Sequence, residues 1–82
     1  MAKLRTLSGR DLLRIFDHFG FASVSQNGSH IKLRRLLADG TRQTLIIALH
    51  EEVDKGTVRA IFRQALAYIT DADLRPFFFT RD

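Results

Sequence analysis

Apolar residues recur at helical spacing in the first quarter of the chain. Ser8 can cap the free amide of Asp11, and Gly20 is a typical residue at which a helix stops. The spacing predicts a helix over about residues 9–19. Its apolar face carries four side chains: Leu12, Ile15, Phe16 and Phe19.

A second helical pattern begins near Thr57, which we expect to be its cap, and runs to about Thr70. Arg59 and Arg63 lie one turn apart on its outer face, which is typical of a solvated surface. The expected buried stripe consists of Val58, Ile61, Phe62, Ala65, Leu66 and Ile69.

Between these helices the polar and apolar residues alternate in short runs separated by turn residues. Asn27-Gly28 is a strong hairpin signal, and Gly40 marks a second turn. Alternation of this kind indicates half-buried strands. The sequence therefore predicts three antiparallel strands at residues 21–26, 29–36 and 42–49.

The length of the second turn determines which side chains share a face of the sheet. A three-residue loop with Gly40 in the left-handed region places Ile31 opposite Ile47 and Leu33 opposite Leu45. This register collects the large apolar residues on one face, so we adopt it. It also predicts that His50 lies near His30, diagonally across the strands. The opposite, more polar face then carries His30, Lys32 and Arg34, with Arg42, Thr44 and Ala48 beside them.

The C-terminal segment has two interpretations. Pro76 should end any helical turn begun after Asp71, and the three consecutive residues Phe77–Phe79 follow it. The phenylalanines either cover a thin core or form a contact with a partner or a second copy of the chain.

These elements predict an α+β fold with two layers in the order α-β-β-β-α. Both helices should cover one face of a three-stranded antiparallel sheet, which is the double-stranded-RNA-binding-domain-like architecture. We expect a single domain over residues 1–82, with its core in 6–70 and a phenylalanine-rich C-terminal tail in 71–82.

Charge is concentrated in the first half of the chain. Residues 1–35 contain seven lysines and arginines against two aspartates, a balance of +5, whereas residues 36–82 contain six against seven, a balance of −1. A positive bias suits nucleic acid, an acidic protein partner or simple solubility, and does not choose among them.

The composition also restricts the class of protein. The 82 residues include no cysteine, which excludes a disulfide framework and a thiolate metal site. No apolar run is long enough to span a bilayer, and the first residues lack the apolar segment of a signal peptide. We therefore expect a soluble, cytoplasmic protein.

His30 is the main candidate for chemistry. It lies where the second strand begins after the first hairpin turn, with Lys32 and Arg34 on the same strand face. A titratable ring therefore lies beside fixed positive charge. This combination suits an anionic substrate. Gly56 and Thr57 begin a helix, where free amides favour an anion, but helix capping explains them equally well.

Other catalytic arrangements have little support. The acidic residues are not clustered with histidines at the spacing of metal ligands, so we expect no metal site. The chain also lacks a glycine-rich phosphate loop with a lysine and a Gly-x-Ser-x-Gly nucleophile turn.

Several of these stretches together resemble the HicA toxins, also called YcfA-like proteins, over about residues 6–69. The resemblance is carried by Gly20-Phe21, Gly28-Ser29-His30-Ile31, Ile47-Ala48-Leu49-His50 and the helix start Gly56-Thr57-Val58-Arg59 with its continuation to Ala65.

The resemblance implies a metal-independent RNA endonuclease, an mRNA interferase without a cofactor, that is neutralised by a HicB-type antitoxin protein. The family's catalytic histidine corresponds to His30, which would act as general base or acid. His50 is either the complementary acid or an anchor for its loop. Candidate RNA contacts are Gly28, Ser29, Lys32 and Arg34. The alternatives are a non-catalytic RNA-binding domain and a protein-interaction module.

Overall fold

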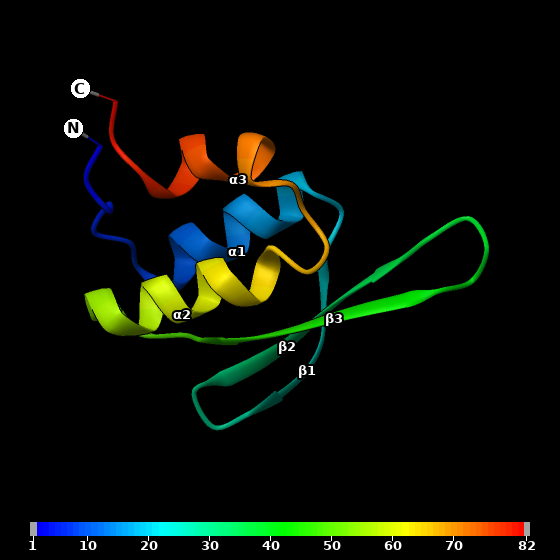
Figure 1. Ribbon diagram of the computed structural model, residues 1–82. Helices are drawn as coiled ribbons and strands as arrows, with labels where there is room; N and C mark the ends of the chain where they lie inside the picture. Colours follow the sequence, from blue (N-terminus) through cyan, green and yellow to red (C-terminus); the bar gives the residue numbers. More distant parts are fainter. Residues whose placement is uncertain (1, 82) are drawn as a thin grey trace.

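Three helices lie on one side of a three-stranded antiparallel sheet in the computed structural model, which describes residues 2–81 (Figure 1). The strand order is β1-β2-β3, so β2 is central. The predicted α+β fold is confirmed, with one helix more than expected. The terminal residues 1 and 82, which the predicted domain includes, lie outside the described residues. The elements are α1 (Gly9–His18), β1 (Ala22–Asn27), β2 (His30–Leu36), β3 (Arg42–Ala48), α2 (Lys55–Ala65) and α3 (Asp71–Phe78).

Helix α1 begins and ends as its sequence predicts. The Ser8 hydroxyl accepts a hydrogen bond from the Asp11 amide at 3.0 Å, and the Asp11 carboxylate accepts one from the Ser8 amide at 2.9 Å. Gly20 follows the helix with a φ of 90°. At the first turn, a side chain on Gly9 would place its Cβ 2.6 Å from Leu49 Cα, so glycine allows α1 to touch the end of β3.

The β2–β3 hairpin has the predicted register. Ile31 pairs with Ile47 and Leu33 with Leu45, and all four side chains are buried. Gly40, with a φ of 87°, lies in the three-residue loop between Leu37 and Thr41. This face of the sheet packs into the core beneath the helices, and the opposite face is open.

The first hairpin differs from its prediction by one residue. Asn27 pairs with His30, so the turn residues are Gly28 and Ser29 rather than Asn27 and Gly28. Gly28 has a φ of 61°, while no non-glycine residue among 2–81 has a positive φ. Glycine at the first central position is the pattern of a type II′ turn, which leaves Asn27 in the strand. Farther from the turn, a bulge between Ser23 and Ser25 changes the β1–β2 register by one residue.

Helix α2 begins earlier and ends earlier than predicted. The cap is Asp54, whose carboxylate accepts hydrogen bonds from the Thr57 amide at 3.0 Å and the Thr57 hydroxyl at 2.7 Å. Thr57 is therefore the residue that is capped. The helix ends at Ala65, and the buried Ile69 lies in the segment that leads to α3.

Helix α3 is a correction to the expectation that Pro76 ends helical structure. The helix continues through Pro76, and the Phe79 amide donates to the Arg75 carbonyl at 2.9 Å across it. Burial explains this outcome, since Leu74 and Phe78 are fully buried. The Phe78 ring lies 6.0 Å from the Phe16 ring and 5.3 Å from the Phe62 ring, measured between centroids. The core-covering interpretation of the tail is confirmed.

The two ends of the described chain run side by side (Figure 1). The Thr80 amide donates to the Lys3 carbonyl, and the Arg5 amide donates to the Phe78 carbonyl, both at 2.7 Å. A second short bridge joins Leu7 to Val53. The N-terminal segment therefore links α3 to the loop before α2. No helix within residues 2–81 is long and apolar enough to cross a membrane.

Candidate active site around His30

His30 is the first residue of β2, directly after the Gly28-Ser29 turn. It pairs with Asn27 on β1 and with Ala48 on β3, and its side chain is exposed. Because Ile31 points into the core, strand alternation places His30 on the open face. The Gln26 side chain braces the turn by donating to the Gly28 carbonyl at 2.9 Å.

A groove of about 380 Å³ runs beside His30 along the edge of the sheet. One wall comes from the strands and the other from α2 and its cap. The groove therefore runs along α2 beside the sheet, from Gly56 in the first turn of the helix to Gln64 near its last. Its lining residues are His30, Ile46, Ala48, Asp54, Gly56, Thr57, Ala60, Ile61 and Gln64.

The groove contains one carboxylate. Hydrogen bonds from the Thr57 hydroxyl and then from the Thr57 amide hold the pKa of the Asp54 carboxyl below its usual range. Asp54 is therefore ionised at neutral pH and places a negative charge in the same groove as His30. Both of its oxygens bind Thr57, so capping accounts for the role of this pair at the start of α2.

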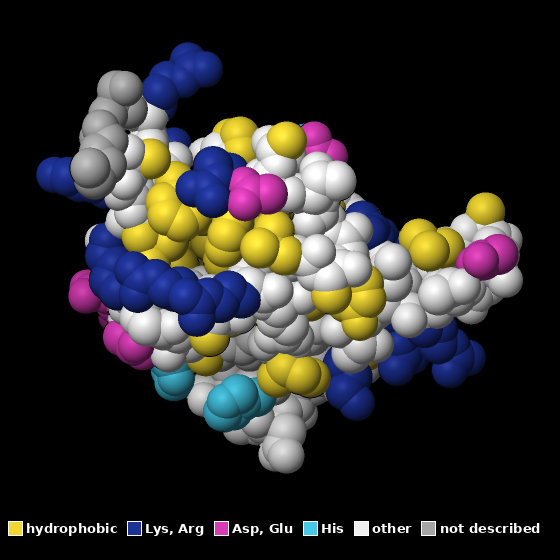
Figure 2. All heavy atoms as spheres, viewed as in Figure 1, with side chains coloured by type: hydrophobic (Ala, Val, Ile, Leu, Met, Phe, Trp, Pro, Cys, Tyr) yellow, Lys and Arg dark blue, Asp and Glu magenta, His cyan; other side chains and the backbone are white. Residues whose placement is uncertain are grey.

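Lys32 and Arg34 follow His30 on the open face, and both are flanked by shorter side chains. Lys32 pairs with Ser25 and Ile46, and Arg34 pairs with Ala22 and Thr44. Lys32 is exposed and Arg34 is half-buried. The buried Nε of Arg34 makes no hydrogen bond within the described part of the chain. Figure 2 shows Lys and Arg side chains gathered near the β2–β3 hairpin and over α2.

His50 lies beside the start of α1. The expected register is confirmed here, because the Leu49 amide donates to the Ser29 carbonyl at 2.6 Å and brings the end of β3 to the start of β2. The His50 and His30 side chains nevertheless line different hollows. The His50 carbonyl accepts a hydrogen bond from the Gly9 amide at 2.7 Å, so the backbone of this residue anchors its loop to α1.

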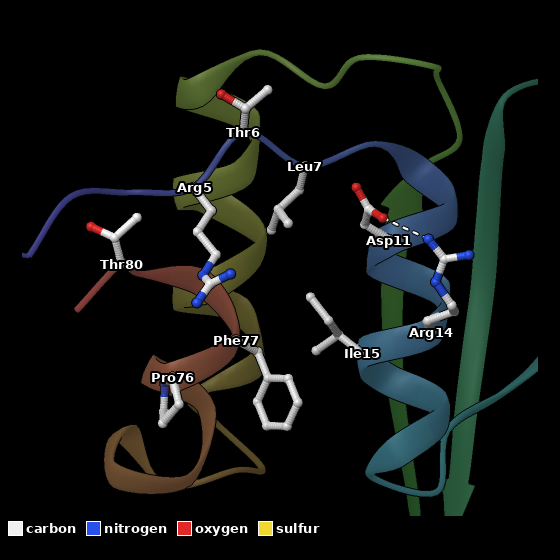
Figure 3. A pocket seen from close by; sticks show the side chains of 9 residues that line it. All are labelled: Arg5, Thr6, Leu7, Asp11, Arg14, Ile15, Pro76, Phe77 and Thr80. Carbon is white, nitrogen blue, oxygen red and sulfur yellow. Dashed lines mark hydrogen bonds and ion pairs between the residues drawn. The ribbon is translucent and has the colours of Figure 1, made fainter.

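A larger hollow of about 690 Å³ lies away from His30, between the N-terminal segment, α1 and α3 (Figure 3). Phe77 and Ile15 face each other across it, and Arg5 extends into the space beside α3. The Arg14–Asp11 ion pair at 2.7 Å forms one side. The hollow contains none of the site residues predicted from the sequence.

Within residues 2–81, no group of three or more His, Asp or Glu side chains is arranged to hold a metal ion. The described site is therefore composed of a histidine, a carboxylate that caps a helix, and two neighbouring cations.

The comparison with protein families agrees with this organisation. Residues 9–66 match the family model described as the HicA toxin of bacterial toxin-antitoxin. The chain belongs to the HicA toxin family. It is therefore the toxin component of a toxin–antitoxin pair, and its partner is an antitoxin. The match extends from the start of α1 to the end of α2 and contains His30 and its groove, whereas α3 lies beyond it. Neither the search of curated proteins nor that of solved structures found a match.

Proposed function

We propose that this toxin is an RNA endonuclease that cleaves mRNA without a metal ion, with His30 as its catalytic general base or acid. The observation that carries the proposal is the position of His30. It is an exposed imidazole at the rim of a groove, inside the family match, with Lys32 and Arg34 on the same strand face.

The reaction requires the transfer of two protons. A base removes the proton from a 2′-hydroxyl, whose oxygen then bonds to the adjacent phosphorus. The bond from phosphorus to the 5′-oxygen breaks, and an acid protonates that oxygen. The products are a 2′,3′-cyclic phosphate and a 5′-hydroxyl. Imidazole suits both roles near neutral pH, and a positioned acid or base contributes about 10²–10⁴-fold.

His50 is the candidate for the complementary acid, and its neighbour Leu49 is bonded to the turn that carries His30. The alternative is that His50 only anchors its loop, which its carbonyl already does through Gly9. If His50 is the acid, His50→Gln reduces cleavage, and if it is only an anchor through its carbonyl, His50→Gln cleaves normally.

Positive charge beside His30 would hold the RNA. Lys32 and Arg34 would supply cations for phosphates on one side of the scissile bond, toward the tip of the β2–β3 hairpin. Gly28 and Ser29 form the turn next to His30, where the lack of a side chain on Gly28 lets a nucleotide approach the backbone. Single-stranded mRNA in the cytoplasm is the substrate that fits an open sheet face, and a HicB-type protein is the antitoxin that we propose.

The test is cleavage of a single-stranded RNA in EDTA by wild type, His30→Ala and His18→Gln. His18 is an exposed histidine on α1 whose ring packs on Phe19 and Phe77, each at 5.1 Å between centroids, so its variant is a matched control. We expect wild type and the control to cut alike and His30→Ala to cut at least about 100-fold more slowly. Equal cutting by wild type and His30→Ala, or no cutting by wild type, contradicts the proposal.

The alternative function is a non-catalytic RNA-binding domain, which the basic open face favours. Its signature is salt-sensitive RNA binding that His30→Ala leaves unchanged, with no cleavage products. Absence of both binding and cleavage would instead favour a protein-interaction module.

A further inference from the structure

At Ile46 the outer edge of β3 is covered by a side chain instead of another strand. The Ile46 amide donates to Gln64 Oε1 at 2.9 Å, and Gln64 Nε2 donates to the Ile46 carbonyl at 3.2 Å. One glutamine thus satisfies both backbone groups of one residue. Glutamine is suited to this contact because its carboxamide carries a donor and an acceptor, like a peptide group.

The hydrogen-bond pattern of the sheet explains why Ile46 needs such a partner. The bond between Leu49 and Ser29 marks a position where β3 bonds to β2. Hydrogen bonding alternates from residue to residue along an antiparallel pair. The amide and carbonyl of Ile47 therefore also point toward β2, whereas those of Ile46 point outward. An open edge of this kind is available to other strands unless something covers it.

The same contact fixes α2 beside the strand that pairs with His30. The chain leaves β3 at Ala48, reverses through residues 49–54 and returns as α2, so that Gln64 comes to lie at Ile46. The loop therefore holds α2 at its first turn, and Gln64 holds it near its last. Both Gln64 and Ile46 line the groove that contains His30.

We propose that Gln64 is a positioning residue for the His30 site. Its two hydrogen bonds set the separation between the α2 wall of the groove, at Thr57 and Ala60, and the strand wall at Ala48 and His30. This inference rests on the proposed RNA cleavage, and Gln64 itself touches no reacting atom.

Packing of α2 against the core would by itself fix the separation between the two walls of the groove less well. The buried face of α2 consists of apolar side chains, and apolar contacts have no preferred direction along the helix axis. The paired hydrogen bonds are directional and tolerate only small displacements. Reacting groups displaced by about 1 Å can lose on the order of 100-fold in rate.

Hydrogen exchange tests the clamp without reference to activity. Gln64→Leu keeps a side chain of similar bulk and helix propensity but makes no hydrogen bond. We expect the Ile46 amide to exchange at least about tenfold faster in Gln64→Leu than in wild type. Leu66→Ala is the matched control, since Leu66 follows α2, is 37% exposed and does not line the groove, and it should leave Ile46 exchange unchanged.

Kinetics test the positioning role. We expect the kcat for RNA cleavage to fall at least about tenfold in Gln64→Leu, while KM changes little because Lys32 and Arg34 are unaltered. Gln64→Glu retains an acceptor for the Ile46 amide but loses the donor for its carbonyl, so its kcat should lie between those of wild type and Gln64→Leu. Leu66→Ala should cleave as wild type does.

Each pattern of results has one meaning. Faster Ile46 exchange with unchanged kcat would make Gln64 an edge cover only, overturning the positioning role and leaving the proposed function intact. Equal Ile46 exchange in wild type and Gln64→Leu would overturn the clamp itself. A wild-type protein that does not cleave RNA would refute the proposed function, and the positioning role with it, whatever the exchange data show.

Discussion

Arg34 and Arg35 are neighbours in β2 with different roles, because strand alternation points them to opposite faces. Arg34 lies on the open face beside Lys32. Arg35 lies over the Phe21 ring, with its guanidinium carbon 4.7 Å from the ring centroid. It donates to the Gln43 side chain at 2.8 Å, the Phe19 carbonyl at 2.9 Å and the Tyr68 carbonyl at 3.0 Å. Arg35 thus joins the end of α1, the sheet and the segment after α2.

This contact set predicts a large effect on stability. Arg35→Met keeps much of the apolar stem but leaves two carbonyls without their donors. We expect the free energy of unfolding to fall by about 2 kcal/mol, measured by urea denaturation. Arg59→Met, at an exposed position of α2, should change it by less than about 0.5 kcal/mol. Equal effects of the two variants would show that the Arg35 contacts add no stability.

At the scale of elements, α3 is part of the core although it lies beyond the family match. Phe78 fills the space between Phe16 on α1 and Phe62 on α2. Because a chain of this size has a thin core, a fully buried ring makes a large contribution to its stability. The helix therefore forms despite Pro76, whose local cost is smaller than the gain from burial.

Truncation of this ring should be among the most destabilising changes in the chain. Phe78→Ala removes a side chain with no exposed surface, and we expect a loss of about 4 kcal/mol in the free energy of unfolding. The neighbouring Phe77 is only partly buried, so Phe77→Ala should cost clearly less. Urea denaturation of both variants measures the difference. Similar losses would indicate that α3 does not pack as described.

At the scale of the whole molecule, some of the positively charged side chains of residues 1–35 make contacts within the fold, and others lie on the open face of the sheet. Arg35 is used within the fold, whereas Lys32 and Arg34 lie along the open face from His30 toward the tip of the hairpin. The positive charge on the face that RNA would meet is therefore smaller than the charge count of residues 1–35 indicates.

This division predicts the salt dependence of RNA binding. Lys32→Ala and Arg34→Ala should each reduce the slope of log affinity against log salt concentration by about 0.7, the value expected for one phosphate contact to a single strand. Lys3→Ala, in the N-terminal segment beside α3, should leave the slope unchanged. Fluorescence anisotropy with a labelled RNA measures the slopes. An equal reduction for Lys3→Ala would mean that binding follows net charge instead of the open face.

Local signals predicted much of the fold. The cap at Ser8, the stop at Gly20 and the loop at Gly40 depend on the backbone preferences of a few residues, and all three are confirmed. The first hairpin was missed by one residue because Asn27-Gly28 and Gly28-Ser29 both suit a two-residue loop. The structure takes the second option, in which Gly28 alone adopts a positive φ.

The site was predicted only in part. His30 and its basic neighbours follow from strand alternation and from the family motif, and their places on the open face are confirmed. The hollow that His50 lines depends on the packing of α1 against the end of β3, which no short motif encodes. Gln64 was missed because its partner, Ile46, lies 18 residues away in the sequence.

By itself the sequence determined the two long helices, the three strands, the β2–β3 register and the HicA family, because capping, turn chemistry and alternation act over a few residues. Only the tertiary structure decided that Arg35 supports the fold, that α3 continues through Pro76 and that Gln64 covers the edge of β3 at Ile46. Each of these depends on side chains brought together from distant parts of the chain. Burial and hydrogen bonding there exceed the local preferences of the backbone, so the geometry of the groove at His30 is a property of the assembled fold.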